Sequence, residues 1–271
     1  MNAQNVAIAI GLTVLAGLST GLGGVAALFM KRTNTKLIAI ILGFSAGVMI
    51  YVSFVEILYE ARARLTEGMG AGLGAWITVI SFFGGIFLIG IIDKLVPSFE
   101  NPHEMHKVEE LGVCDVPREK PHLMMRTGFF VALAVTIHNL PEGLAVFTSA
   151  VAEPNLGVAI AIAVAIHNIP EGVAVSIPIY CATGSRRKAF WFSFASGFTE
   201  PLGALIGWLV LMPFMSDTLF GIVFAAVAGI MVFISFDELL PAAQAYGEHH
   251  LSVYGMIGGM LVMAISLLLF I

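Results

Sequence analysis

Long apolar runs are the feature that most restricts the fold of this 271-residue chain. Each run reaches roughly 20 residues, the length that an α-helix needs to cross a hydrocarbon core of about 30 Å. The runs are continuous, whereas a membrane β-barrel requires short strands of alternating polarity. Polar breaks separate runs at about 6–30, 37–60, 74–93, 127–150, 156–180, 188–212, 218–241 and 251–271. The sequence therefore predicts an all-α membrane protein with eight transmembrane helices.

Composition agrees with a membrane protein. Charged residues make up 11% of the chain and the mean hydropathy is +0.94, whereas a soluble domain carries about 25% charged residues. So little charge cannot cover a soluble globule of this size. A secreted enzyme, a nucleic-acid-binding protein and a disordered protein are therefore all disfavoured. The net charge of −5 reflects few acids against fewer bases, and it indicates no particular partner.

Basic residues set the expected orientation, because cytoplasmic loops of membrane proteins are enriched in Lys and Arg. If the N-terminus lies outside, all of the 13 Lys and Arg residues except Arg62 and Arg64 fall on the inside. We therefore expect both termini outside, in the periplasm, and one transporter domain over residues 1–271. The largest loop, about 97–125, would be cytoplasmic.

That loop carries three histidines among several glutamates, namely His103, His106 and His122. Two interpretations are open. The loop is either a loose metal-binding segment or a solvated linker, and long loops are often linkers of this kind. We expect no ordered second domain in it.

A ten-residue motif occurs twice inside the membrane, at 137–146 and again 29 residues later at 166–175. Both copies read His-Asn-x-Pro-Glu-Gly. A short turn joins the two helices, so they must run antiparallel and place the copies at similar depth. Inverted pairs of this kind recur in transporters around a site near the membrane midplane.

The spacing within the motif brings ligands together. Each histidine precedes a glutamate by four residues, so both side chains share one helix face, and the asparagine adds an amide oxygen. Pro141 and Pro170 each remove a backbone hydrogen bond and free a carbonyl, which membrane helices tolerate where the breach lines a site. The candidate ligands are His138, Asn139, Glu142, His167, Asn168 and Glu171.

Carboxylates in the membrane need a positive partner. Glu142, Glu171 and Glu200 all fall within apolar runs, with no Lys or Arg in mid-span. One ionised group at the bilayer centre costs on the order of 3 kcal/mol. A helix–helix hydrogen bond would explain a single His–Glu pair, but it does not explain two copies together with Glu200. A divalent cation supplies the missing charge and takes His, Glu and Asn as ligands.

The chain resembles the ZIP (Zrt-, Irt-like protein) family of metal-ion transporters. The resemblance is carried by the paired HNxPEG motifs, the eight spans and the histidine-containing loop, and by Ala-Thr-Gly-Ser at 182–185, which is similar to a bacterial branch. It implies a binuclear centre between the second, fourth, fifth and sixth helices. The first metal position would use Met49, His138, Glu142 and Glu171. The second would use Asn139, His167, Asn168 and Glu200, with Glu142 and Glu171 bridging. The resemblance also implies alternating access, by sliding of one helix group against another, and a homodimer.

Further polar residues would line a path. Ser53 and Glu56 follow Met49 on roughly the same helix face, toward the outside. Asp237 and Glu238 lie near the cytoplasmic end of the seventh helix and would receive metal on exit, unless they only form a solvated helix end.

We thus predict a secondary transporter in a bacterial inner membrane rather than an enzyme. It would import Zn(II), with Fe(II), Mn(II), Co(II) and Cd(II) also suited to these ligands. The sequence has no GxxxxGK[ST] loop for ATP. One alternative is a membrane-embedded zinc hydrolase that uses His138, Glu142 and Glu171 with a bound water, although HExxH is absent. A proton-linked carrier of organic solutes is the other, and it leaves the duplicated motif unexplained.

Overall fold

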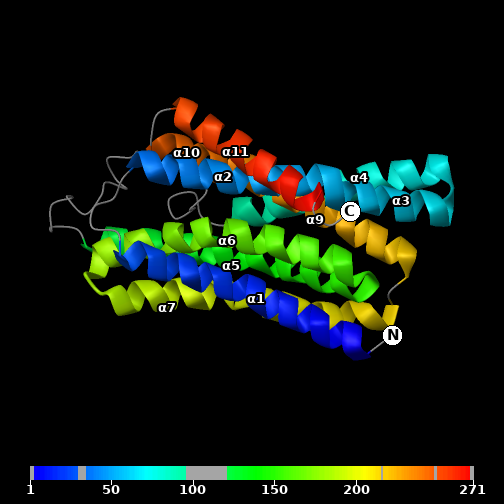
Figure 1. Ribbon diagram of the computed structural model, residues 1–271, viewed down its shortest axis with the longest axis horizontal. Helices are drawn as coiled ribbons and strands as arrows, with labels where there is room; N and C mark the ends of the chain where they lie inside the picture. Colours follow the sequence, from blue (N-terminus) through cyan, green and yellow to red (C-terminus); the bar gives the residue numbers. More distant parts are fainter. Residues whose placement is uncertain (1–2, 30–34, 96–120, 215, 247–248, 269–271) are drawn as a thin grey trace.

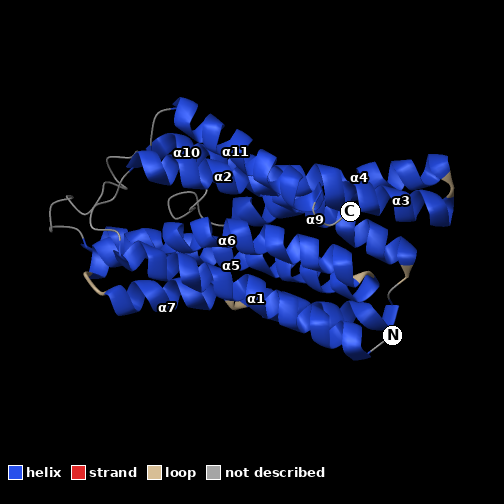
Figure 2. Ribbon diagram, in the orientation of Figure 1, coloured by secondary structure: helices blue, strands red, loops and turns tan. Residues whose placement is uncertain are grey.

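The computed structural model describes residues 3–29, 35–95, 121–214, 216–246 and 249–268 (Figure 1). Every regular element in these ranges is helical, which confirms the predicted all-α class (Figure 2). The loop histidines His103 and His106 lie outside the described residues. His122, which we expected in the loop, lies in the first turn of a helix.

The helices follow one another through short connections. They are α1 (Ala3–Phe29), α2 (Thr35–Val52), α3 (Leu58–Met69), α4 (Ala71–Leu95), α5 (Pro121–Ala152), α6 (Pro154–Thr183), α7 (Arg186–Gly197), α8 (Thr199–Ile206), α9 (Asp217–Ile234), α10 (Leu240–Tyr246) and α11 (His249–Leu268). Wider π-helical turns lie at η1 (Ser53–Ile57), η2 (Gly207–Leu211) and η4 (Ser235–Leu239), and a 3₁₀ turn at η3 (Met212–Phe214).

Six helices in the described ranges are long and apolar enough to cross a membrane, by length and composition. The longest runs without a break from Lys36 to Met69, through α2, η1 and α3. The expected end near residue 60 was therefore too early. The polar extension stays helical because Arg64 pairs with Glu60 on α3 and with Asp217 on α9. The remaining two predicted runs correspond to α5, which begins at Pro121 rather than near 127, and to α7–α8.

The helices form two bundles that lie side by side (Figure 1). The first, here called the repeat bundle, contains α1, α5, α6, α7 and α8, and α1 packs on α5, α6 and α7. The second, the flanking bundle, contains α2, α3, α4, α9, α10 and α11, with α2 against α11 and α4 against α9. Contacts between the bundles include α2 with α6 and α5 with α9. Both copies of the motif therefore lie in one bundle and face the other.

Glycines hold the helices of each bundle close together. A Cβ added at Gly85 would meet the backbone oxygen of Ala226, which brings α4 against α9. A Cβ added at Gly23 would meet that of Ile169, which brings α1 against α6. Several of the described glycines lie so close to another helix that an added Cβ would meet its backbone. In every such case the other helix belongs to the same bundle as the glycine. Close backbone packing thus fixes each bundle internally.

Candidate metal centre

The centre is built on α5 and α6, which run antiparallel because Glu153 alone separates them. Pro154 occupies the first turn of α6, where its missing N–H removes no helical hydrogen bond. Both helices continue through the prolines of the motif, Pro141 and Pro170. The two copies are thereby held against each other near the middle of the repeat bundle.

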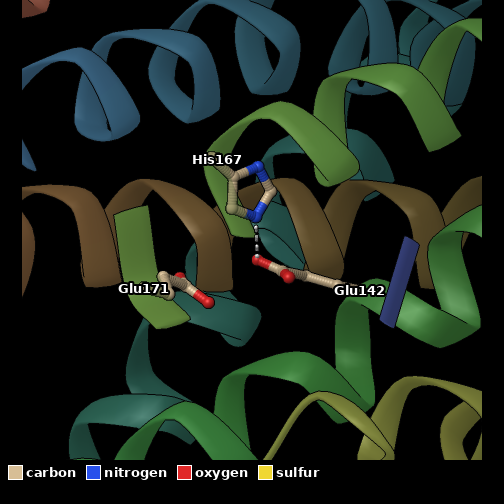
Figure 3. Close-up of side chains that lie close together, drawn as sticks. All are labelled: Glu142, His167 and Glu171. Atoms are coloured by element: carbon tan, nitrogen blue, oxygen red, sulfur yellow. Dashed lines mark ion pairs between the residues drawn. The ribbon is translucent and has the colours of Figure 1, made fainter. Parts of the chain in front are cut away.

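Glu142, His167 and Glu171 form the core of the centre (Figure 3). One ligand atom from each side chain lies within 4.8 Å of the others, and all three residues are buried. His167 Nε2 is 3.1 Å from Glu142 Oε1. In the part of the chain that the structure describes, no Lys or Arg forms an ion pair with these three side chains.

The second nitrogen of His167 fixes its tautomer. Nδ1 lies 3.1 Å from the carbonyl oxygen of Ala163, one turn back in α6. Because a carbonyl oxygen can only accept, we assign the ring proton to Nδ1. Nε2 then presents a lone pair to a carboxylate oxygen, an arrangement that requires a proton or a cation between the two atoms. Metal-binding histidines are oriented in this way by a carbonyl on the other ring nitrogen.

The two asparagines of the motif are oriented by backbone carbonyls. Asn139 Nδ2 donates to the carbonyl of Ser196, at 3.1 Å, and Asn168 Nδ2 to that of Ala16, at 3.0 Å. Asn168 Nδ2 also donates to Glu200 Oε1. A carbonyl acceptor requires the nitrogen of each amide to face it, so the oxygens Oδ1 must face the other way.

Several buried oxygens around this cluster have no hydrogen-bond partner among the described residues. They are both carboxylate oxygens of Glu142 and of Glu171, Oε2 of Glu200, and Oδ1 of Asn139 and Asn168. A buried polar atom left unsatisfied costs about 1–3 kcal/mol, and more when it is charged. Carboxylate and amide oxygens only accept, so a metal cation is a partner that can take them as ligands.

His138 lies apart from this core. Its Nε2 is 3.2 Å from Oε2 of Glu238, which comes from η4 of the flanking bundle. The structure therefore brings His167 together with the two motif glutamates, and it places His138 in an ion pair between the bundles.

The comparisons with known proteins identify the family of this chain. Residues 100–267 match the family described as ZIP Zinc transporter. The chain belongs to the ZIP family. It is 59% identical to Zinc transporter ZupT of Lysinibacillus sphaericus (strain C3-41) over 98% of this chain and 99% of the relative. It is also 59% identical to Zinc transporter ZupT of Streptococcus mutans over 96% of each chain, and 55% identical to that of Clostridium perfringens over 100% of this chain and 98% of the relative.

Membership in the ZIP family confirms the resemblance, including its bacterial branch. The relatives are transporters rather than enzymes, and nothing in the comparisons supports the hydrolase alternative. A multi-pass membrane protein is likewise supported by the family and by the apolar helices.

The family resemblance had implied Met49 as a soft ligand. Met49 is fully buried on α2, and Ser45, one turn earlier on the same face, donates to the carbonyl of His167 at 3.3 Å. This face of α2 therefore lies on α6 beside the centre. The ligand role of Met49 stays a prediction.

The four predicted pathway residues lie in two π-helical turns. In η1, Ser53 is buried and its hydroxyl has no hydrogen-bond partner within the described ranges, and Glu56 is half-buried. In η4, Asp237 is exposed and Glu238 is half-buried. Their role in a pathway also stays a prediction.

Sequence reasoning missed two contributions to the centre. One is the pairing of Glu238 with His138. The other is α1, whose carbonyl at Ala16 orients Asn168. A backbone acceptor leaves no residue-type signal, but the small residues at Gly17 and Gly197 mark the close crossing of α1 and α7.

Proposed function

We propose that this chain is a secondary transporter that imports divalent transition-metal ions, Zn(II) foremost, into the cytoplasm. The observation that carries the proposal is the buried cluster of Glu142, His167 and Glu171, with which no Lys or Arg forms an ion pair among the described residues. A cation that enters such a cluster supplies the missing charge. The relatives' name as zinc transporters supports Zn(II) as the substrate.

The centre takes two metal ions in this proposal. The first position uses Met49, His138, Glu142 and Glu171, and the second uses Asn139, His167, Asn168 and Glu200. Glu142 and Glu171 bridge the two. Support for the second position comes from the unpartnered oxygens of both asparagines and of Glu200. Loading of the first position requires His138 to exchange Glu238 for the metal. The same N and O ligands suit Fe(II), Mn(II), Co(II) and Cd(II).

Transport proceeds by alternating access, in which the repeat bundle slides along the flanking bundle. The distribution of glycines supports this motion, because close backbone contacts lie within each bundle and the bundles meet through side chains such as Ser45 and Glu238. Ser53 and Glu56 serve the entrance, and Asp237 with Glu238 the exit. Carboxylates shared between ions allow ligand exchange, so that the metal is released rather than trapped.

The chain spans a bacterial inner membrane eight times and forms a homodimer in this proposal, with both termini in the periplasm. The distribution of Lys and Arg supports the orientation. Neither ATP nor nucleic acid takes part, so the metal gradient drives the flux.

Reconstituted protein tests the function directly. Liposomes that contain a metal-sensing dye should show saturable Zn(II) uptake, which His138→Ala and Glu142→Ala should abolish. Ser149→Ala is a matched control on α5, because the Ser149 hydroxyl bonds only carbonyls of its own helix. Normal flux in both site variants would refute the site. No metal flux in the intact protein would instead return attention to the hydrolase alternative.

A further inference from the structure

The two motif copies are contacted by two different helices in the same way. Asn139 of the first copy donates to the carbonyl of Ser196 on α7, and Asn168 of the second donates to that of Ala16 on α1. The positions are 29 residues apart within the repeat and 180 residues apart between the acceptor helices. The internal symmetry therefore extends beyond the motif to α1 and α7–α8.

The glycines of the two motif copies show the same correspondence between α1 and α7–α8. A Cβ added at Gly143 would meet the backbone oxygen of Glu200, and one added at Gly172 would meet that of Thr20. The same correspondence holds one turn further on, where Gly203 meets the carbonyl of Leu140 and Gly23 meets that of Ile169. Thr20 on α1 thus occupies the place that Glu200 occupies on α8.

The two acceptor helices cross at equivalent residues. A Cβ added at Gly17 would meet the carbonyl of Gly197, and one added at Gly197 would meet the carbonyl of Gly17 and the side chain of Thr20. The Thr20 side chain is consequently held at the crossing, one turn from the carbonyl that orients Asn168. The place of Thr20 at this crossing is therefore fixed by backbone packing as well as by the internal symmetry.

The hydroxyl of Thr20 is buried and has no hydrogen-bond partner among the described residues. Buried helical threonines usually bond the carbonyl four residues back, as Thr13 does at 2.7 Å on the same helix. For Thr20 that carbonyl belongs to Ala16, which already accepts from Asn168 Nδ2 and Ser19 Oγ in addition to its helical backbone N–H. These donors already occupy the two lone pairs of the oxygen. The usual local bond is therefore closed to Thr20.

We propose that Thr20 Oγ1 is an oxygen ligand of the second metal position, presented from α1 as Glu200 is presented from α8. The inference rests on the proposed function in assigning Glu200 to that position. A hydroxyl supplies a lone pair without a negative charge, so the position gains an oxygen without a further carboxylate. Fewer charges hold a divalent ion less tightly, which suits a site that must release its ion.

Thr20→Val is the decisive variant, because valine keeps the shape and removes only the hydroxyl. Loss of an unsatisfied buried hydroxyl is close to neutral or stabilising, so the Tm of the metal-free protein should stay equal or rise. The Tm increase that Zn(II) causes should shrink, because a ligand is lost only from the bound state. Titration of the purified full chain with Zn(II) should show two sites, one of which binds about tenfold more weakly than in the unchanged protein.

Two further variants control the result. Thr13→Val removes an equally buried hydroxyl from α1, but one that bonds its own helix, and it should leave the Zn(II)-induced Tm increase unchanged. Thr20→Ser keeps the oxygen and should keep both sites. If valine at position 20 prevents folding, Thr20→Ala removes the same hydroxyl without bulk and is compared with Thr20→Ser.

Glu200→Gln separates this inference from the function on which it rests. Loss of the second site in Glu200→Gln but not in Thr20→Val would overturn the role of Thr20 alone. Two intact sites in both variants would overturn the second metal position as well. Loss of the second site in Thr20→Val but not in Glu200→Gln would mean that the Thr20 hydroxyl binds metal without Glu200. That result would overturn the assignment of both residues to one position.

Discussion

The ion pair between His138 and Glu238 joins the two bundles through an atom that the first metal position needs. His138 Nε2 lies 3.2 Å from Glu238 Oε2, with side chains only 2% and 13% exposed, so water screens the pair little. The contact is a charge–charge attraction when the imidazole is protonated and the carboxylate is ionised, and an interaction with a charged group contributes about 1 kcal/mol more than one between neutral groups. Glu238→Gln keeps the shape and removes the charge, which should weaken the contact by about 1 kcal/mol.

Zinc must displace Glu238 before it can bind His138, so the weaker contact should favour zinc. A change of about 1 kcal/mol corresponds to about a fivefold lower dissociation constant at the first position. Transport should nevertheless slow, because the variant loses the carboxylate to which we assign the ion on exit. Competitive titration against a zinc-binding dye at fixed pH measures the affinity, and flux into liposomes measures the rate.

Glu60→Gln is the matched control, since Glu60 pairs with Arg64 at 2.6 Å in the same flanking bundle but away from the centre. Its zinc affinity should equal that of the unchanged protein. Zinc binding that is equal or weaker in Glu238→Gln would refute the competition between Glu238 and the metal for His138. Tighter binding with unchanged flux would refute only the exit role.

Three further predictions concern packing, a ligand oxygen and pH. Gly17→Ala places a methyl group against the carbonyl of Gly197, and it should lower both the Tm and the zinc stoichiometry. Gly11→Ala should change neither, because nothing lies within 4 Å of a Cβ at Gly11. An equal effect of the two variants would contradict the packing argument. Asn139→Leu removes the amide oxygen at similar volume and should weaken the second site by about tenfold in a titration with Zn(II). An unchanged second site would exclude Asn139 as a ligand. Acidification should slow Zn(II) uptake because protons compete with metal for carboxylates and imidazoles, so uptake that stays flat from about pH 5 to 8 would contradict this competition.

The fold class and the cluster of motif glutamates with His167 could be predicted because their signals are local. Long apolar runs specify membrane helices by length alone. The spacing from His167 to Glu171 specifies one helix face, and a short turn after α5 specifies antiparallel neighbours. Boundaries were less certain where charged residues pair with each other, as Arg64 does on α3, because the sequence shows the charge and not its partner.

The partners of the two histidines could not be predicted. His138 and His167 lie in almost identical local sequences, so no local rule distinguishes them. Their different partners come from tertiary contacts, with Glu142 beside one and Glu238 beside the other. The contribution of α1 had a readable signal, because Ala16, Gly17 and Thr20 are spaced as Ser196, Gly197 and Glu200 are. The contacts of the two asparagines and of the motif glycines show that this shared spacing reflects one repeated arrangement.

The flanking bundle contacts the two copies of the motif in different ways. Within the repeat bundle, exchange of the two motif copies leaves the pattern of ligands almost unchanged. The flanking bundle breaks this equivalence, since η4 presents Glu238 to His138 while α2 presents Ser45 to the backbone of His167. Among the described residues, the histidine of the first copy is the one that pairs with a carboxylate of the flanking bundle. In the proposed pathway, an ion that leaves the first position would meet Glu238 on the side where His138 already contacts it. The asymmetry that would favour one exit therefore lies outside the repeat itself.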